Sequence, residues 1–348
     1  MGCKRLQSQS GAWRTGTIAG VPASNPYFAL VEATPVREDS LDLLGGTTHY
    51  WTYGPSDAPL TIVAVHGFRG EHHGLEPIVV QLPGIRIISP DLPGFGESTP
   101  MTEAGHDIDG YAKWLTAFVA GLDLPTAPVI LGHSFGSIVV SAAVAGGLAT
   151  PRLILINPIA APALHGPKAV VTKLAIFYYW AGARLPKALG NVLMGSQVIT
   201  RFVSQVMVTT PDRSLRRWIH DQHRTYFGRF SDRDTLLEAF KASTGNNIIE
   251  YAHGITMPTL LIAAAEDPIT TVEDEKKLAG MLDDAQLVVL PEVGHLIHYE
   301  KPAEAAAAIL KFVGSASTRR SSSDAQPTTS TRRSSSDAQR RVSRPRTP

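Results

Sequence analysis

The sequence LGHSFGS, Leu131 to Ser137, places Ser134 between two glycines directly after an apolar run. This segment fits the pattern G-x-S-x-G, in which a strand ends in a sharp turn and a helix begins. Side chains beside the serine would block such a turn, which explains the glycines, and the turn exposes the serine hydroxyl. A strand-like run precedes the motif and a helical pattern follows it, so we predict that Ser134 is a nucleophile rather than an ordinary turn residue.

Short apolar runs of strand length alternate with helical patterns on both sides of this motif. The later runs are apolar throughout, which is typical of strands buried on both faces of a parallel sheet. The alternation predicts an α/β fold with a mostly parallel sheet flanked by helices. The expected strands are residues 41–44, 47–53, 60–65, 85–89, 129–131, 153–156, 259–264 and 286–290, and the expected helices are residues 109–122, 134–145, 272–282 and 302–313.

Two later segments supply an acid and a base, in the chain order expected after a nucleophile on a strand-to-helix turn. The segment AEDPIT ends one expected strand, and in it Asp267 is the candidate acid and Glu266 its rival. The segment PEVGHLIHYEKP follows the next strand, and in it His295 is the candidate base. His298 is interpreted as packing at a helix start. A neutral His295 would take the Ser134 proton while the carboxylate holds the required tautomer.

An earlier loop, VAVHGFRGEHHG, follows one of the first expected strands. We predict that the backbone N–H of Phe68 in this loop and the N–H of Phe135 together form an oxyanion hole. The loop histidines His66, His72 and His73 lack an obvious carboxylate geometry, so no metal site is expected among them.

Three further polar residues are interpreted as structural rather than catalytic. His220 and His223 lie three residues apart on an expected helix, and we expect them on its solvent-exposed face. Asp91, in SPDLPGFGEST, precedes the serine in the chain and does not fit the expected order of acid and base.

The alternation of strands and helices is interrupted once, between about residues 161 and 255. The pattern there is helical with no clear strand, and an insertion of this size between two strands predicts a helical cap over one edge of the sheet. We therefore expect an α/β core of residues 31–160 and 256–314 and a cap of residues 161–255.

Both ends of the chain are expected to lie outside this core. Residues 1–30 are expected to be poorly structured. Residues 315–348 hold eight arginines, two aspartates and a segment, STRRSSSDAQ, that recurs with a period of 13 residues. Such a tail buries too little apolar surface to offset its ordering entropy, so we expect disorder. Its serines follow paired arginines, so phosphorylation or contact with an anionic partner is a hypothesis for the tail.

Composition excludes several other classes of protein. The chain has 348 residues, a net charge of +1 and a single cysteine, so no intramolecular disulfide is possible. Because the tail is basic, the remainder is mildly acidic, and we expect no nucleic-acid surface on it. The first residues lack the apolar core of a secretory signal, and no apolar stretch is long enough to span a bilayer. A cytoplasmic location is therefore the expectation.

Taken together, the segments HGFRG, DLPGFGES, GHSFGS, EDPI and GHLIHYEKP resemble the α/β-hydrolase superfamily over about residues 40 to 313. The resemblance implies an eight-stranded sheet, a cap inserted after the sixth strand, no cofactor, and a catalytic triad of Ser134, Asp267 and His295. Branches of the superfamily that open epoxides or remove halogens use an aspartate nucleophile. Ser134 at this position therefore argues against both activities.

The expected function is hydrolysis of a small-molecule carboxylic ester or thioester with an apolar acyl group, through an acyl-enzyme. Tyr178, Tyr179 and Trp180 of the cap are candidates for the lining of the acyl pocket, and the cap's own core is the alternative place for each. The main alternative function is hydrolysis of a carbon–carbon bond in a meta-cleavage product. A cofactor-free haloperoxidase-like enzyme and a non-catalytic binding protein are the remaining alternatives. The sequence makes no prediction of the oligomeric state.

Overall fold

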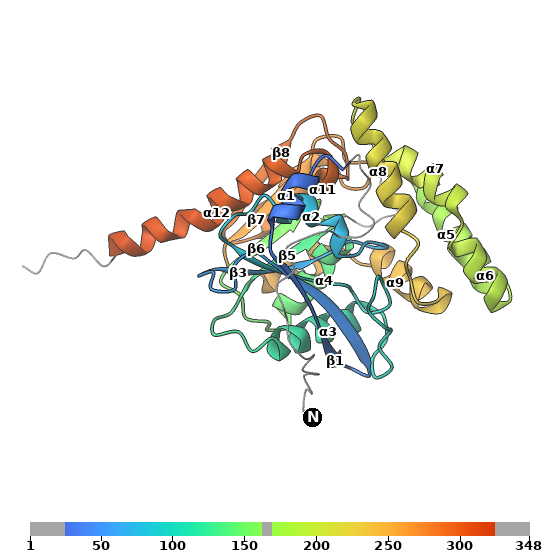
Figure 1. Ribbon diagram of the computed structural model, residues 1–348, viewed down its shortest axis with the longest axis horizontal. Helices are drawn as coiled ribbons and strands as arrows, with labels where there is room; N and C mark the ends of the chain where they lie inside the picture. The colour runs from blue at the N-terminus through green and yellow to red at the C-terminus, as the bar shows by residue number, and fades with distance from the viewer. Residues whose placement is uncertain (1–24, 162–168, 324–348) are drawn as a thin grey trace, which may run out of the picture. The chain divides into compact units, whose positions relative to one another are not determined.

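A sheet of eight strands forms the centre of the computed structural model, which describes residues 25–161 and 169–323 (Figure 1). The strand order in the sheet is β1-β2-β4-β3-β5-β6-β7-β8. Strands β3 to β8 are parallel to one another, and the pairs β1–β2 and β2–β4 are antiparallel, which confirms the predicted mostly parallel sheet. The strands are β1 Val36–Leu43, β2 Gly46–Tyr53, β3 Thr61–Val65, β4 Arg86–Pro90, β5 Val129–His133, β6 Leu153–Ile156, β7 Thr259–Ala264 and β8 Ala285–Leu290.

Helices pack on both faces of this sheet, as the alternating pattern predicts. Two of the helical elements, η1 and η2, are short 3-10 helices. The helical elements are α1 Phe28–Ala33, η1 His72–Gly74, α2 Glu76–Val79, α3 Ile108–Gly121, α4 Phe135–Ala145, α5 Ala169–Arg184, α6 Lys187–Met194, α7 Gln197–Met207, α8 Arg213–Tyr226, α9 Arg233–Gly245, η2 Ile248–Gly254, α10 Val272–Met281, α11 Ile297–Glu300 and α12 Pro302–Ser323.

Alternate residues of each strand serve opposite faces of the sheet. Val63 and Val65 of β3 belong to the core that α3 and α4 cover. Ile62 and Ala64 of the same strand point the other way and face Ile78 of α2. Because the central parallel strands β3, β6 and β7 are buried on both faces, their sequences are largely uninterrupted apolar runs.

The antiparallel edge of the sheet begins with a two-residue hairpin. Leu44 and Gly45 connect β1 and β2 with φ values of 50° and 76°. Two consecutive residues with positive φ are typical of the turn whose twist matches that of the flanking strands. Strand β1 begins at Val36, earlier than its apolar residues suggested, because its first part is polar and only partly buried.

Helices α5 to α9 all lie between β6 and β7, and we refer to residues 169–245 as the helical insertion. No strand occurs in the described part of this insertion. Helices α8 and α9 begin at Asp212 and Asp232, whose carboxylates accept hydrogen bonds from the backbone N–H groups of the first turn. These local signals explain where the two helices start.

Helix α8 contradicts the expectation that His220 and His223 face solvent, because both histidines are buried. Helix α7 packs on α8. The hydroxyl of Ser204 on α7 lies 2.6 Å from His220 Nδ1 and 2.7 Å from His223 Nδ1. A spacing of three residues places two side chains on one face of a helix, and here a second helix covers that face.

The two ends of the chain also differ in part from expectation. Helix α1 begins at Phe28, inside the segment expected to be poorly structured, and Tyr27 before it packs edge-on against Trp218. Helix α12 runs to Ser323, since no glycine or proline interrupts residues 315–323. The remainder of the expected disordered tail, like residues 1–24, lies outside the described residues.

None of the helices in residues 25–161 and 169–323 is both long enough and apolar enough to cross a membrane.

Candidate active site

Ser134 stands at the turn between β5 and α4, near the middle of the parallel sheet. Its φ of 52° is positive, a conformation that residues other than glycine rarely adopt. The backbone N–H of Ser134 donates to Ile156 O at 3.0 Å, which ties the turn to the neighbouring strand β6. Its Oγ lies 2.7 Å from His295 Nε2, so the strained turn presents the hydroxyl to a histidine 161 residues away.

The glycines of the motif are needed because backbone segments approach them closely. A Cβ on Gly136 would lie 2.6 Å from the carbonyl oxygen of His66, and one on Gly132 would lie 2.6 Å from the carbonyl oxygen of Gly136. Both distances are shorter than any ordinary contact of a Cβ atom. The pattern G-x-S-x-G therefore follows from the packing of β5, the start of α4 and the loop after β3.

His295 and Asp267 form the next contact in this chain of hydrogen bonds. His295 Nδ1 lies 2.7 Å from Asp267 Oδ2, and both side chains are almost completely buried. Since ionised Asp267 only accepts, Nδ1 carries the proton and Nε2 is left to accept from Ser134. Asp267 follows β7 and His295 follows β8, so both residues lie where the carboxyl ends of parallel strands meet.

Two further donors surround the Asp267 carboxylate. Asn157 Nδ2 donates to Oδ2 at 2.9 Å, and the backbone N–H of Ile269 donates to Oδ1 at 2.8 Å. Burial raises the pKa of Asp267, but attraction to His295 and the donated hydrogen bonds outweigh it. The net effect holds the pKa of Asp267 below its usual value, so the carboxylate is ionised at neutral pH.

Glu266 is the alternative to Asp267, and His298 the alternative to His295. Their surroundings differ from those of the two candidates. Glu266 is exposed, whereas Asp267 contacts His295. His298 is buried in α11, and its ring packs edge-on against that of His133 with 4.3 Å between the ring centroids. Burial and the neighbouring His133 hold the pKa of His298 well below its usual value, so it is neutral. These contacts confirm the interpretation of His298 as a packing residue near a helix start.

The loop after β3 lies directly against the turn at Ser134. A Cβ on Gly67 would lie 3.1 Å from Ser134 Cβ, so the backbone that carries the Phe68 N–H passes beside the serine. His66 holds this loop, since its Nε2 accepts from the Leu92 N–H at 2.9 Å and its Nδ1 donates to Gly67 O at 2.8 Å. Phe68 and Phe135 are the two predicted donors. Their rings pack edge-on, with 6.3 Å between the ring centroids.

Arg69 connects the same loop to the helical insertion. Its guanidinium donates to Phe227 O at 3.0 Å, to Met194 O at 2.9 Å and to the Tyr179 hydroxyl at 3.3 Å. The side chain is buried, and it lies over the Phe227 ring at 4.9 Å. These contacts join residues up to 158 positions apart in the sequence. They hold the insertion against the loop that contains the predicted oxyanion donor Phe68.

The three candidate pocket residues have different surroundings. Tyr179 is buried, stacks on Phe240 at 3.8 Å between ring centroids, and contacts the Phe68 ring at 5.9 Å. The hydroxyl of Tyr178 donates to the carbonyl oxygen of Leu193 inside the insertion. Trp180 is half exposed and stacks on its neighbour Phe177. Of these three residues, Tyr179 is the one that contacts Phe68, whose loop lies beside Ser134.

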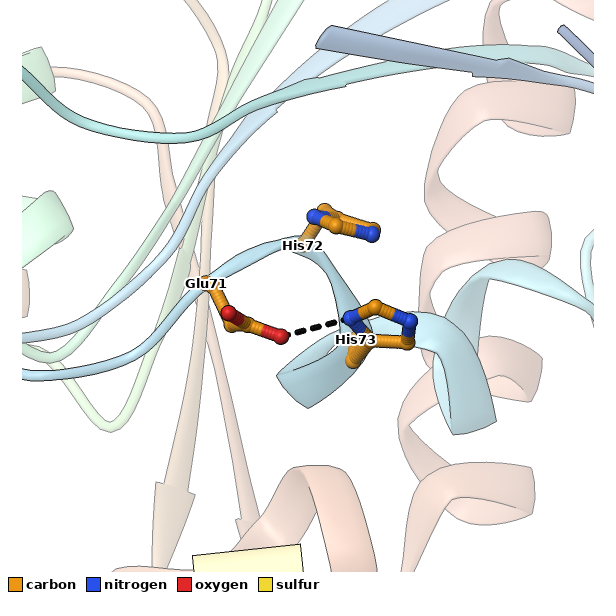
Figure 2. Close-up of side chains that lie close together, drawn as sticks. All are labelled: Glu71, His72 and His73. Atoms are coloured by element: carbon orange, nitrogen blue, oxygen red, sulfur yellow. Dashed lines mark hydrogen bonds and ion pairs between the residues drawn. The ribbon is translucent and has the colours of Figure 1, made fainter. Parts of the chain in front are cut away.

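Glu71, His72 and His73 form a cluster in the loop that precedes α2. One ligand atom from each lies within 4.8 Å of the others, which is the spacing that a metal ion needs. Figure 2 shows Glu71 pointing to His73, whose Nδ1 lies 2.6 Å from Glu71 Oε1. His72 Nδ1 lies 2.9 Å from Asp91 Oδ1. Each ring thus has one nitrogen engaged by a carboxylate.

The rings of this cluster also stack on residues outside it. His72 stacks on Trp51 of β2 at 3.3 Å between ring centroids, and His73 stacks on Tyr226 of α8 at 4.3 Å. We therefore interpret the cluster as a polar network that joins the sheet to the helical insertion. The absence of a metal site stays a prediction. Asp91 accepts three hydrogen bonds here, in keeping with the structural role expected for it.

Asn157 and Arg69 are the site residues that the sequence motifs did not reveal. Asn157 directly follows β6. A polar residue at the end of a central strand was the feature of the sequence that could have identified it as a site residue. Arg69 lies in the glycine-rich loop sequence HGFRG. An arginine in such a loop usually faces solvent.

Comparison with known proteins agrees with this arrangement. The alpha/beta hydrolase family matches residues 62–308. The uncharacterized hydrolase YugF of Bacillus subtilis is 25% identical over 290 residues, or 77% of this chain and 94% of that protein. A 2-hydroxy-6-oxononadienedioate/2-hydroxy-6-oxononatrienedioate hydrolase of Cupriavidus pinatubonensis is 24% identical over 275 residues, or 73% of this chain and 87% of that protein.

Among solved structures, the enol-lactonase of Burkholderia xenovorans is similar, with a TM-score of 0.65 at 19% sequence identity. The similarity covers 79% of this chain and 99% of the lactonase. The family match spans most of the chain, and the strand order and the turn at Ser134 agree with it. The chain therefore belongs to the alpha/beta hydrolase family.

Proposed function

We propose that this hydrolase cleaves a carboxylic ester or thioester with Ser134 as its nucleophile. The observation that supports this proposal is the continuous contact from Ser134 Oγ through His295 to Asp267, with 2.7 Å at each step. The two contacts use opposite nitrogens of one imidazole, as proton transfer from a hydroxyl requires. Asp267 is ionised in this arrangement, so it would stabilise the imidazolium that forms when His295 accepts the proton.

The first half of the reaction forms an acyl-enzyme. His295 Nε2 removes the hydroxyl proton of Ser134 as Oγ attacks the acyl carbon, and the carbonyl oxygen becomes an oxyanion. The backbone N–H groups of Phe68 and Phe135 would stabilise this charge, because Phe135 begins α4 and Phe68 lies in the loop beside Ser134. His295 then gives the proton to the leaving alcohol or thiol as the bond from the acyl carbon breaks.

The second half repeats these roles with water. His295 takes a proton from a water molecule whose oxygen attacks the acyl carbon of the acyl-enzyme. The tetrahedral intermediate collapses, the bond between Ser134 Oγ and the acyl carbon breaks, and His295 returns the proton to Oγ. The products are a carboxylic acid and the free enzyme.

The aromatic residues near the predicted oxyanion hole favour an apolar acyl group. Phe68 contacts Phe95, Phe135, Tyr179 and Phe240, each with ring centroids about 6 Å away. The other four rings are buried, and Phe68 is the partly exposed ring of the group, so it would present apolar surface beside Ser134. We propose that Tyr179 lines the acyl pocket. Tyr178 and Trp180 remain weaker candidates, since one bonds inside the insertion and the other is half exposed.

Hydrolysis of a carbon–carbon bond is the second candidate function. The similarity to the Cupriavidus pinatubonensis hydrolase, named for dienoic and trienoic substrates, favours it. The same serine, histidine and aspartate would serve either reaction, and what would distinguish them is the polarity of the predicted acyl pocket.

A panel of p-nitrophenyl esters of increasing acyl length, assayed beside a ring-cleavage dienoic ketone, tests both candidates. The ester proposal expects turnover of medium-chain esters that Ser134→Ala abolishes. Turnover of the ketone with none of the esters would establish the second candidate instead. Ester binding that Ser134→Ala leaves unchanged, with no turnover of either substrate, would identify a binding protein and refute both.

A further inference from the structure

Helix α7 of the helical insertion shows its apolar side to solvent. Its buried residues, Thr200 and Ser204, are polar and face α8. Val198, Phe202 and Val206 recur every four residues on the opposite side, and we call them the α7 stripe. Val198 is 79% exposed and Phe202 is 63% exposed. A surface helix of a globular protein normally has the reverse arrangement, so the α7 stripe calls for a partner outside the described chain.

The helix before it also exposes apolar side chains. Leu189 and Val192 of α6 are three residues apart and exposed, with Val192 at 74%. Helices α6 and α7 lie together along the edge of the insertion farthest from the sheet (Figure 1). Exposed side chains of this size cluster seldom on a surface that stays in water.

A cationic groove lies beside the stripe, between α7 and α8. It has a volume of about 440 Å³ and is lined by Arg201, Gln205, Arg213, Arg216, Arg217 and His220. Arg216 donates to the carbonyl oxygen of Thr210. Within the described residues, Arg201, Arg213 and Arg217 form no ion pair. Several guanidinium groups around one groove repel each other unless an anion lies among them.

The nearest carboxylates do not neutralise the groove. Asp212 caps α8 and accepts hydrogen bonds from Ser214 and Leu215. Glu300 accepts from the N–H and the hydroxyl of Thr209. Their hydrogen bonds do not remove their charges, but helices α7 and α8 carry five arginines against Asp212, Asp221 and Glu300, so the net charge around the groove is positive.

We propose that the α7–α8 face of the insertion docks on an anionic phospholipid bilayer. The guanidinium groups of the groove would bind lipid phosphates, with which arginine pairs bidentately. The α7 stripe would enter the boundary between headgroups and acyl chains, where amphipathic helices lie with their apolar side down. Exposed apolar residues and unpaired arginines on adjacent helices are the two features that such a surface requires.

The alternatives account for only one of these features. A free phosphate would satisfy the arginines but would leave Phe202 and its neighbours in water. A second copy of the chain, paired through a twofold axis, would cover the stripe but would present an equally cationic groove and no anion to the arginines. The positive charge of the groove therefore favours an anionic lipid surface as the occupant.

Co-flotation of the full-length chain with lipid vesicles tests this proposal. We expect binding to vesicles of phosphatidylcholine mixed with phosphatidylserine, and much weaker binding to phosphatidylcholine alone. The double change Val198→Ser and Phe202→Ser should lower the partition coefficient about tenfold or more, since it removes two apolar side chains that the bilayer would bury. The double change Arg201→Gln and Arg217→Gln should lower it about 25-fold and flatten its salt dependence, because each basic residue near an anionic surface contributes roughly fivefold.

Matched controls come from α10, which carries an exposed methionine and an exposed lysine. Met281→Ser and Lys276→Gln should leave binding unchanged. Far-UV circular dichroism would show that all variants are folded. Equal binding by the wild type and both double variants would overturn the proposal. So would a wild-type dimer in size-exclusion chromatography that Phe202→Ser dissociates, with no vesicle binding by either chain.

Discussion

Asn157 donates a hydrogen bond of 2.9 Å to Asp267 Oδ2, the same carboxylate oxygen that His295 Nδ1 contacts at 2.7 Å. The amide and the imidazole thus hold the same carboxylate oxygen, which limits rotation of the carboxylate. Its own backbone is tied to β7, since the Asn157 N–H donates to Ile262 O at 2.8 Å. Asn157 is therefore a positioning residue of the proposed catalytic site.

The first prediction concerns Asn157→Ala. Loss of the side-chain bond should lower kcat by roughly tenfold, equivalent to about 1.4 kcal/mol of transition-state stabilisation, with little change in KM. Asn246→Ala is the control, because the Asn246 amide bonds only to the nearby Ala242 carbonyl on α9. Steady-state kinetics on the best ester would measure both. An unchanged kcat for Asn157→Ala would show that the amide does not position Asp267.

The second prediction concerns Arg69, which joins the loop of Phe68 to the helical insertion. Arg69→Met keeps the length of the side chain but loses all three hydrogen bonds to the insertion. We expect the free energy of unfolding to fall by about 2–3 kcal/mol, because buried carbonyl groups lose their donor. We also expect kcat/KM to fall, since the insertion would no longer be held against the predicted acyl pocket.

Urea unfolding and steady-state kinetics would measure these two effects. Arg229→Met is the matched control, since Arg229 is more exposed and its ion pairs are with Glu71 and Glu97. Stability and kcat/KM equal to those of the control would contradict the role given to Arg69.

The third prediction concerns Glu275, a buried residue of α10. Burial, with a further contribution from the Asp267 charge, raises the pKa of Glu275 to about 9. The folded chain therefore keeps this carboxyl neutral at pH 7, whereas the unfolded chain ionises it. A raised carboxyl pKa lowers stability progressively from about pH 4.5 to about pH 9. Glu275→Gln should remove this loss and stabilise the chain by roughly 3 kcal/mol at pH 7.

Urea unfolding at pH 5, 7 and 8.5 would test the sign of this effect. The stability gap between Glu275→Gln and the wild type should widen as the pH rises. Glu273→Gln, on the exposed side of the same helix, should give a small gap at every pH. A gap for Glu275→Gln that is constant across the range would contradict the assignment of a neutral buried carboxyl.

The fourth prediction concerns the close packing of the turn at Ser134. In Gly136→Ala the added Cβ would meet the His66 carbonyl oxygen at 2.6 Å, so backbone must move. We expect a loss of about 3 kcal/mol of stability and a large loss of turnover. Gly280→Ala, on α10 with open space around it, should be neutral or slightly stabilising. Thermal melting of the two variants would distinguish them, and equal melting temperatures would contradict the packing argument.

The central strands of the parallel sheet, β3, β5, β6 and β7, could be predicted from the sequence because each is a mainly apolar run buried on both faces. Residues 153–156 and 259–264, for example, form β6 and β7 with the predicted ends. Strand β1 lies at the sheet edge and begins with polar residues, so its first five residues, Val36 to Ser40, escaped prediction.

The proximity of Ser134, Asp267 and His295 could be predicted because each follows a parallel strand, and such strand ends meet at one edge. Their catalytic role stays a proposal. The positions of Arg69 and of the buried histidines of α8 could not be predicted, since they depend on how helices pack far along the chain. Arg69 bonds to Met194 across 125 residues, and no periodic pattern in the sequence encodes such a contact.

The most direct test of the proposed function is covalent labelling of Ser134 by a fluorophosphonate. The account predicts that intact-mass measurement of the wild type shows one phosphonyl adduct, located by peptide mapping to the segment GHSFGS, and none on Ser134→Ala. His295→Ala should label far more slowly, because Ser134 would lose its proton acceptor. Equal labelling of the wild type and Ser134→Ala, or an adduct on another residue, would contradict the account.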